Sequence, residues 1–458
     1  MAGIGFELQK VLKGGGLANL FKVALAGIVI VAGPWLISIM GIFFLTRFAG
    51  FALTEGADLF MAAIVYSYAF SLSLFGGLHY IFTRYISDHI YVSKEGRAVS
   101  TLLMVMILFI GLAALLAMPA VFFIQTEFIS NLLLYKISAV LLFIVINLIW
   151  LVMIFITLLK KYMTIFLVYL SGMAISFFAV YYLGSLYKLG GALAGFTMGQ
   201  LYILIFLLFL IVKAFPPEKI WVEFKPLMSY FKKYKYLFLA GVFYSSGIWV
   251  DKITLWIMVG SPVLGTYLKL FEPYDITVYF ANLTIIPGLV YFMVFSETNF
   301  YSVLKKFLLT IEKSILTRIR EEKYRLIRTM NSSLYEQSFF QGVISVGLII
   351  MAPYINSSFL NNHTDLTTLR IVLLAVFFHI FFVTLLTFLF YIEMYREAFL
   401  STAVFFFINM IVTIVFVKLQ FPFYGLGYLA ASISACIISS SYLRYGVRTL
   451  DRRIYGKF

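Results

Sequence analysis

Two charged residues stand inside a mostly apolar stretch of this sequence. Asp251 and Lys252 lie within residues 237–259. A charge in the hydrocarbon of a bilayer costs at least ~2.5–3.5 kcal/mol, so such charges usually mark a transport path or an ion pair. As sequence neighbours on a helix they point about 100° apart, and they need not pair with each other. One of them could face a water-filled cleft; a purely structural ion pair is the alternative.

Aromatic and helix-breaking residues form a second set of candidates. Aromatic rings stack on sugar rings, so the candidates for a glycan path are Trp35, Tyr244, Trp249 and Tyr274. Proline inside a helix removes a hydrogen bond and kinks the helix, which frees carbonyl groups to bind substrate or creates a hinge. The hinge candidates are Gly33, Pro34, Pro287 and Gly288. Curvature that serves packing alone is the alternative interpretation of these residues.

Motifs for catalysis are missing from the sequence. It contains no GxxxxGK[ST] phosphate-binding loop, no GxGxxG, no HExxH and no GxSxG elbow. Its 4 histidines lack the spacing of metal ligands. His379 lies in an apolar run and is predicted to be a hydrogen-bonded core residue. We therefore predict no catalytic residue, no metal site and no cofactor, and we do not expect an enzyme.

The segments that carry these residues are long and apolar. Hydrophobic residues make up 63% of the chain and charged residues 12%, whereas soluble domains are roughly half apolar and a quarter charged. The apolar residues fall into blocks of about 20, the length that crosses a ~30 Å hydrocarbon core as a helix. This pattern predicts an all-α integral membrane protein with twelve transmembrane helices, near residues 23–46, 58–82, 99–124, 132–159, 163–186, 190–212, 237–259, 276–298, 334–354, 369–391, 399–417 and 425–443.

Basic residues are unevenly distributed over the predicted connections. If the N-terminus is inside, 28 of the 35 Lys and Arg lie in cytoplasmic segments and only 5 lie in the opposite loops. The positive-inside rule therefore places both the N- and C-termini in the cytoplasm. The net charge of +15 is thus a signal of topology and of contact with anionic lipids, and it does not indicate binding to nucleic acid.

Internal similarity predicts a duplicated six-helix repeat. Ala26, Gly27 and Gly33 of the first span match Ala240, Gly241 and Gly247 of the seventh at one offset. Parallel repeats are related by a pseudo-two-fold axis along the membrane normal, and they leave a cleft between two bundles for alternating access. The predicted parts are a cytoplasmic N-terminal segment 1–22, a six-helix bundle 23–212, a basic cytoplasmic linker 213–236, a second six-helix bundle 237–443 and a basic cytoplasmic tail 444–458.

The second bundle contains a basic cytoplasmic loop, residues 299–333. Its apolar residues recur at helical spacing with basic residues between them. This pattern predicts either an amphipathic helix at the membrane interface or a helical extension of a neighbouring span.

Several blocks of the sequence resemble the PelG family of exopolysaccharide transporters. They are residues 1–8, 32–39, 247–252, 272–276, 286–289 and 297–300. Gln9 and Thr277 depart from the pattern of the family. The resemblance implies a flippase-like fold and export of a hexosamine-rich polysaccharide across the bacterial plasma (inner) membrane. It also adds Glu272 and Asp275, which flank Tyr274, to the candidates for the substrate path.

The resemblance further implies partners. These are a cytosolic PelF-like glycosyltransferase, which could drive the polymer outward as it adds sugars, and membrane proteins that are PelD-like and PelE-like. Basic residues available to these partners or to anionic lipids are Lys232, Lys233, Lys235, Arg318 and Arg320. Two other functions stay open: an ion-coupled flippase of lipid-linked oligosaccharide or small cations, and a non-transporting membrane scaffold for the glycosyltransferase.

Overall fold

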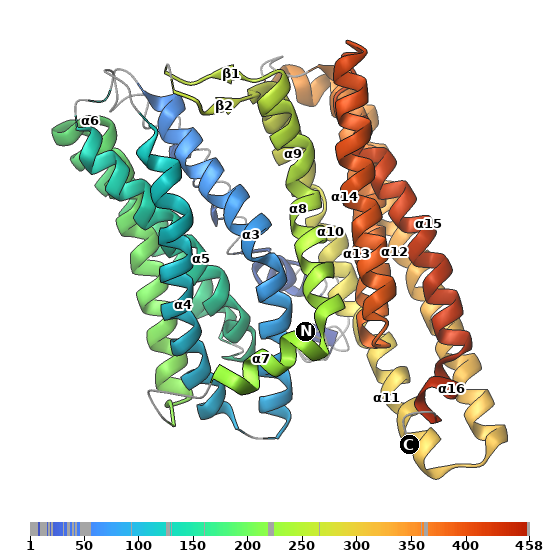
Figure 1. Cartoon of the computed structure of the whole chain (residues 1–458). Helices are drawn as coiled ribbons and strands as arrows, with labels where there is room; N and C mark the ends of the chain where they lie inside the picture. The colour runs from blue at the N-terminus through green and yellow to red at the C-terminus, as the bar shows by residue number, and fades with distance from the viewer. Residues whose placement is uncertain are drawn as a thin grey trace. The chain divides into compact units, whose positions relative to one another are not determined.

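Long α-helices dominate the protein (Figure 1). The computed structural model describes residues 8, 9, 16, 19, 22–30, 32, 33, 37, 38, 41, 44, 45, 56–92, 94–124, 129, 131–159, 161–218, 224–264, 266–358, 360 and 365–455. Within these ranges, 9 helices are long and apolar enough to cross a membrane. The chain is therefore a multi-pass membrane protein. The hinge candidate Pro34 and the substrate-path candidate Trp35 lie outside the described residues.

The chain divides into two compact units, of which the first comprises residues 33–249 and 256–271. Its helices are α3 (Ala57–Tyr91), α4 (Glu95–Phe122), α5 (Leu132–Leu159), α6 (Tyr162–Ala214), α7 (Phe224–Lys233) and most of α8 (Lys235–Met258). Helix α5 packs against α3, α4 and α6, and buried aliphatic and aromatic side chains fill the space between them. A short antiparallel ribbon, β1 (Ser261–Pro262) and β2 (Lys269–Leu270), follows α8.

Helix α6 contains two of the predicted spans, 163–186 and 190–212. The helix breaks at Tyr187 and Lys188, and Lys188 has a positive φ of 53°. The two halves pack against each other: a Cβ on Gly195 would lie 2.5 Å from the carbonyl carbon of Ala179. Small residues allow such a close approach of helix backbones in membranes. The break is therefore a tight turn between two antiparallel helices.

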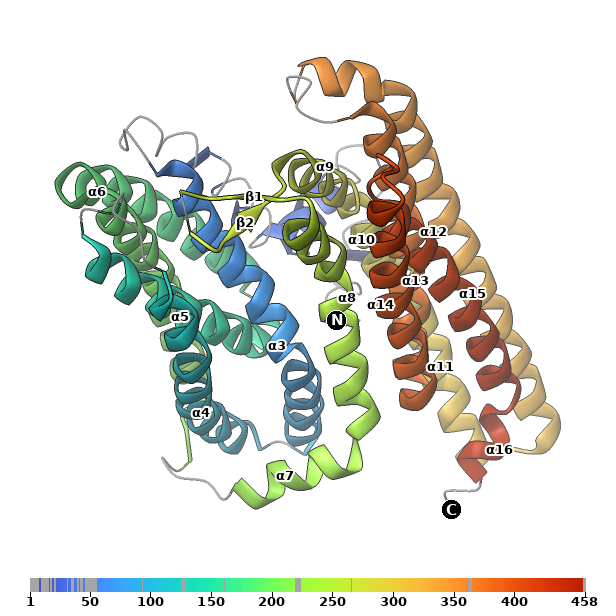
Figure 2. The same cartoon turned by 45° about the horizontal axis from the view of Figure 1, so that its top comes forward.

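Helix α7 lies within the predicted basic linker 213–236 and packs against α3 (Figure 2). Leu227 on one face is buried in the apolar core, whereas Lys232 and Lys233 are exposed. The Tyr230 hydroxyl donates a hydrogen bond of 3.1 Å to Asp88. Burial, together with the Asp88 carboxylate, raises the pKa of Tyr230 to about 12. The linker is thus partly an amphipathic helix fixed to its unit.

The second unit comprises residues 1–32, 250–255 and 272–458. Its main helices are α9 (Glu272–Leu283), α10 (Ile286–Tyr291), α11 (Glu297–Lys313), α12 (Leu316–Ser358), α13 (Leu366–Tyr391), α14 (Tyr395–Lys418), α15 (Leu426–Arg448) and α16 (Leu450–Tyr455). Helix α13 packs against α9, α12 and α15, and α15 also packs against α14 (Figure 1). Helix α13 is therefore the centre of this unit.

The predicted eighth span, 276–298, is not one regular helix. Helix α9 ends at Leu283, α10 begins at Ile286, and a π-helical segment, η1 (Phe292–Ser296), joins α10 to α11. Pro287 accounts for the first break because proline cannot donate a backbone hydrogen bond. The predicted loop 299–333 is a helical hairpin: α11 and α12 extend beyond their spans and turn at residues 314–315. Of the two alternatives for this loop, helical extension is the one observed.

Candidate functional site

The charge pair Asp251–Lys252 lies in the segment of α8 that belongs to the second unit. The Asp251 side chain is 2% exposed and that of Lys252 is 5% exposed. The Lys252 Nζ lies 3.6 Å from the Asp251 Oδ1, so the long lysine side chain brings its ammonium back to the preceding residue. The two neighbours, which need not have paired, form an ion pair. A buried charge is tolerable only when it is compensated in this way.

Tyr274 holds the second oxygen of the same carboxylate. Its hydroxyl donates a 2.5 Å hydrogen bond to the Asp251 Oδ2. Tyr274 is in the first turn of α9 because that helix begins at Glu272, two residues after the β-ribbon ends. Asp275 is buried beside it, whereas Glu272 is exposed. Of the three residues expected in this block, Tyr274 contacts the charge pair directly.

His379 and Tyr428 bring two further helices to this site. The His379 Nδ1 and the Tyr428 hydroxyl form a hydrogen bond, which joins α13 to α15 and confirms His379 as a hydrogen-bonded core residue. Lys252 lies near His379, and Tyr428 lies near Tyr274. We call these five residues, Asp251, Lys252, Tyr274, His379 and Tyr428, the polar cluster. It connects α8, α9, α13 and α15.

The remaining candidates for the substrate path do not join the polar cluster. Trp249 belongs to the first unit and is buried, with its ring 6.4 Å from that of Trp256. Tyr244 lies in the same unit and is half-buried. The hinge candidate Gly33, in the same unit, is helical and buried. The structure thus assembles part of the predicted set in one unit and leaves other members elsewhere in the fold.

The hinge candidates Pro287 and Gly288 lie at the break between α9 and α10. A Cβ on Gly288 would lie 2.3 Å from the Gln341 Oε1, so only glycine fits there without movement. The Gln341 Nε2 donates a 3.2 Å hydrogen bond to the Thr284 carbonyl, just before the proline. An amide on α12 therefore holds the end of the broken helix.

Sequence reasoning missed a buried polar stripe on α12. Its members, Ser333, Gln337, Gln341 and Ser345, are four residues apart and therefore share one helix face. The Thr384 hydroxyl on α13 donates a 2.9 Å hydrogen bond to the Gln337 Oε1. The signal was available, because two glutamines at this spacing are unusual within an apolar span. The stripe ties α12 to α13.

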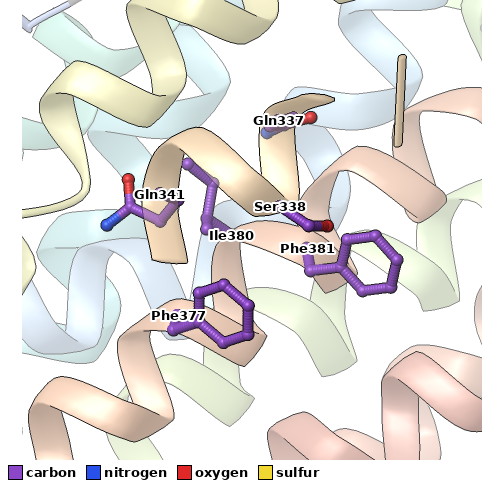
Figure 3. Close-up of a pocket in the computed structure, with 6 residues that line it drawn as sticks. All are labelled: Gln337, Ser338, Gln341, Phe377, Ile380 and Phe381. Atoms are coloured by element: carbon purple, nitrogen blue, oxygen red, sulfur yellow. The ribbon is translucent and has the colours of Figure 1, made fainter. Parts of the chain in front are cut away.

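A small hollow lies beside this stripe (Figure 3). It has no room even for a water-sized molecule, because the volume open to one is about 0 Å³. Sites for small molecules usually enclose ~300–1,000 Å³, so this hollow is too small for a sugar chain. Its lining residues are Gln337, Ser338, Gln341, Phe377, Ile380 and Phe381 (Figure 3), and none of them belongs to the polar cluster.

Glu297 is another buried acid of this unit. It lies where the π-helical segment meets α11, and its Oε1 accepts a 2.5 Å hydrogen bond from the Tyr391 hydroxyl on α13. A carboxylate that is buried away from water needs a hydrogen-bond partner of this kind. The bond fixes the irregular helix to the centre of the unit.

The basic candidates are exposed. Lys232, Lys233 and Lys235 lie at the junction of α7 and α8, and Arg318 and Arg320 lie in the first turns of α12. These side chains are accessible to a partner or to lipid headgroups. Across the described ranges, no group of three or more His, Cys, Asp or Glu could hold a metal ion.

Comparison with known proteins gives one family and one fold. A family model described as "PelG: Putative exopolysaccharide Exporter (EPS-E)" matches residues 1–455. No curated protein matches this sequence. Three solved structures, each 12–14% identical, share the fold.

The first of them is a multidrug resistance MATE family transporter of the MOP superfamily in an outward-facing conformation; it is 12% identical, with a TM-score of 0.58, over 94% of this chain and 97% of that chain. The MATE transporter ClbM in complex with Rb⁺ is 14% identical, with a TM-score of 0.57, over 95% and 96%. A MOP superfamily transporter from Pyrococcus furiosus is 12% identical, with a TM-score of 0.56, over 93% and 96%. The chain therefore has a MATE-like transporter fold.

Proposed function

Because this chain belongs to the PelG family of exopolysaccharide exporters, we propose that it exports a hexosamine-rich polysaccharide across the bacterial plasma membrane. The observation that carries the proposal is the family match over residues 1–455, nearly the whole chain. The transporter fold and the long apolar helices support it. The proposal includes the twelve-span topology with both termini in the cytoplasm, for which the charge distribution is the argument.

The free energy for export comes, in this proposal, from polymer synthesis. The sequence has no phosphate-binding loop with which to hydrolyse a nucleotide. A PelF-like glycosyltransferase that adds sugars at the cytoplasmic face would push the chain outward at each step, with PelD-like and PelE-like membrane proteins holding the assembly together. The exporter itself then has to provide a route and to keep its helices in place around it. The polar cluster serves the second task, because it joins α9, α13 and α15 to residues 250–255 of α8, and its two charges are candidates for lining the route.

Ion-coupled transport is the second candidate. The specific observation that favours it is the fold, which resembles those of multidrug transporters. A buried carboxylate such as Asp251 is a residue type that could exchange a cation during a transport cycle. In that case the substrate would be a lipid-linked oligosaccharide or a small cation, and transport would require an ion gradient.

Reconstitution separates these candidates. The chain is inserted into liposomes together with the PelD-like and PelE-like proteins, with its cytoplasmic loops outside, and the purified glycosyltransferase and a UDP-N-acetylhexosamine are added outside. We expect polymer that is protected from an added glycoside hydrolase, and we expect protection to persist when ionophores collapse all ion gradients. Polymer that stays fully accessible in the presence of the wild-type chain would contradict export and would favour a scaffold. Protection that vanishes with the ionophores would favour ion coupling.

A further inference from the structure

The helical hairpin formed by α11 and α12 carries exposed aliphatic side chains at its turn. Four large ones lie within nine positions of each other: Leu308 (41% exposed), Leu309 (50%), Ile315 (74%) and Leu316 (58%). We call these four residues the hairpin tip. Single exposed apolar residues are common, but a cluster of them usually marks an interaction site.

The hairpin behind the tip is firmly packed. Phe307 and Ile311 of α11 and Ile319 and Leu326 of α12 are buried in this region. The Lys306 Nζ lies 2.7 Å from the Glu322 Oε1, which joins the two helices by an ion pair.

The C-terminal end of the chain holds the hairpin as well. The Lys323 Nζ lies 2.8 Å from the Asp451 Oδ1 and also donates a hydrogen bond to the Arg448 carbonyl. The hairpin beside α16 is visible in Figure 1. Apolar side chains on a preorganised support lose little entropy when they bind a partner.

Lipid does not account for the exposed tip. The predicted span within α12 begins at residue 334, 18 residues after Leu316. At 1.5 Å per residue this is about 27 Å along the helix, and still about 21 Å at a tilt of 40°. The headgroup layer adds only about 5–8 Å beyond the hydrocarbon. Ile315 and Leu316 therefore lie well outside the bilayer. Leu308, ten residues beyond the predicted span 276–298, lies about 15 Å along α11 from its end, which is also beyond the headgroups. Burial against a protein would remove these side chains from water.

The charges around the tip indicate the character of that protein. Between residues 305 and 322 the sequence has five basic residues, Lys305, Lys306, Lys313, Arg318 and Arg320, and three acidic ones, Glu312, Glu321 and Glu322, of which Glu322 is paired with Lys306. Arg318 and Arg320 are exposed and make no ion pair with the described part of the chain. An apolar centre with a charged rim is the usual anatomy of a protein interface.

We propose that the hairpin tip docks into an apolar pocket bordered by acidic residues on a cytosolic protein, and that this protein is the glycosyltransferase that makes the polymer. The identity of the partner rests on the proposed function; the location of the surface rests on exposure, distance from the membrane and charge. The tip supplies the buried centre of the interface, and the arginines supply the rim. Such a rim mainly accelerates and orients association, whereas the apolar centre contributes most of the affinity.

The test measures binding of the purified glycosyltransferase to the full chain in lipid nanodiscs. The test variant carries Ile315→Gln and Leu316→Gln; both side chains are exposed, so we expect an unaltered thermal unfolding midpoint, which is measured on the same sample. The matched control is Val92→Gln, because Val92 is another exposed aliphatic residue in a predicted cytoplasmic segment, at the end of α3. We expect the tip variant to bind at least tenfold more weakly and the control to bind within twofold of wild type. A third variant with Arg318→Glu and Arg320→Glu should weaken binding at low salt and differ less at high salt.

Two results overturn the inference. One is unchanged affinity in the tip variant, and the other is absence of binding by the wild-type chain. Export of polymer is measured separately in cells that make the same variants. If the tip variant loses binding but exports normally, the hairpin tip is a docking surface that export does not require. If the wild-type chain does not export polymer, the proposed function is wrong, while the docking surface is still judged by the binding measurement.

Discussion

Replacing one member of the Asp251–Lys252 pair is expected to destabilise the protein far more than replacing both. Both side chains are almost fully buried, and the ammonium is 3.6 Å from the carboxylate. In Lys252→Met the carboxylate keeps only the hydroxyl of Tyr274, and in Asp251→Asn the ammonium loses its counter-charge. Breaking a buried pair in this way costs about 3–5 kcal/mol, because it leaves one uncompensated charge. The double variant Asp251→Asn/Lys252→Met buries no charge and should lie within about 1 kcal/mol of wild type.

Tyr274→Phe serves as a reference for how much the loss of one hydrogen bond lowers the free energy of unfolding. It removes one hydrogen bond and leaves the ion pair intact. Hydrogen bonds between membrane helices contribute about 0.6 kcal/mol on average and at most about 1.7. We therefore expect each single charge variant to be destabilised more than either Tyr274→Phe or the double charge variant. The coupling energy of the charge pair should exceed about 2 kcal/mol.

The assay is denaturant unfolding of the purified variants in one detergent, combined with export in cells corrected for protein abundance. Strictly additive single variants would refute the reasoning, since they would mean that the two charges do not compensate each other. Export gives independent information. The double variant should keep its abundance yet export less polymer, because charges kept at this depth commonly serve transport. Normal export by the double variant would make the pair purely structural.

Three further predictions concern topology, packing and pH. Cysteines introduced near Lys188 should react with an impermeant reagent added outside intact cells, and cysteines introduced near Lys233 should not. Labelling near Lys233 would contradict the predicted orientation. Gly288→Ala should destabilise by about 1 kcal/mol in unfolding experiments, because its Cβ would lie 2.3 Å from the Gln341 Oε1 and 2.6 Å from the Ile380 Cδ1, two buried side-chain ends that must shift. Burial opposes ionisation of Asp451, but the hydrogen bond from Lys323 holds the pKa of Asp451 below its usual value. The Lys323–Asp451 ion pair should contribute about 0.2–1 kcal/mol to the free energy of unfolding. This contribution should be complete above pH ~4 and should disappear as the pH falls through the lowered pKa. Asp451→Asn should therefore lower the free energy of unfolding at pH 7 but not at a pH below the lowered pKa.

The sequence by itself determined the class of the protein and the positions of most helices. Blocks of about 20 apolar residues can be satisfied in lipid only as helices, because every backbone polar group needs a partner within its own segment. That is why predicted spans such as 369–391 and 399–417 match α13 and α14 closely. The charged pair at residues 251 and 252 stood out for the same physical reason, since charges are rare in such blocks.

Local sequence also limited what could be foreseen in irregular segments. Pro287 and Gly288 indicated a break, but the π-helical turn at residues 292–296 carries no comparable signal. The hairpin of α11 and α12 was one of two possibilities, because its helical spacing fits an interfacial helix as well as an extended span.

Only the tertiary structure decided which residues meet. In a bilayer the lipid-facing and the core-facing sides of a helix are both apolar, so periodicity does not reveal which side carries a contact. Tyr274 reaches Asp251 because α9 begins two residues after the ribbon, and His379 reaches Tyr428 because α13 packs on α15. These contacts join residues far apart in the chain. Because an unpaired polar group is costly where water is absent, each buried group favours the packing that gives it a hydrogen-bond partner. The polar cluster is therefore a product of helix packing, whereas the charges within it were visible in the sequence.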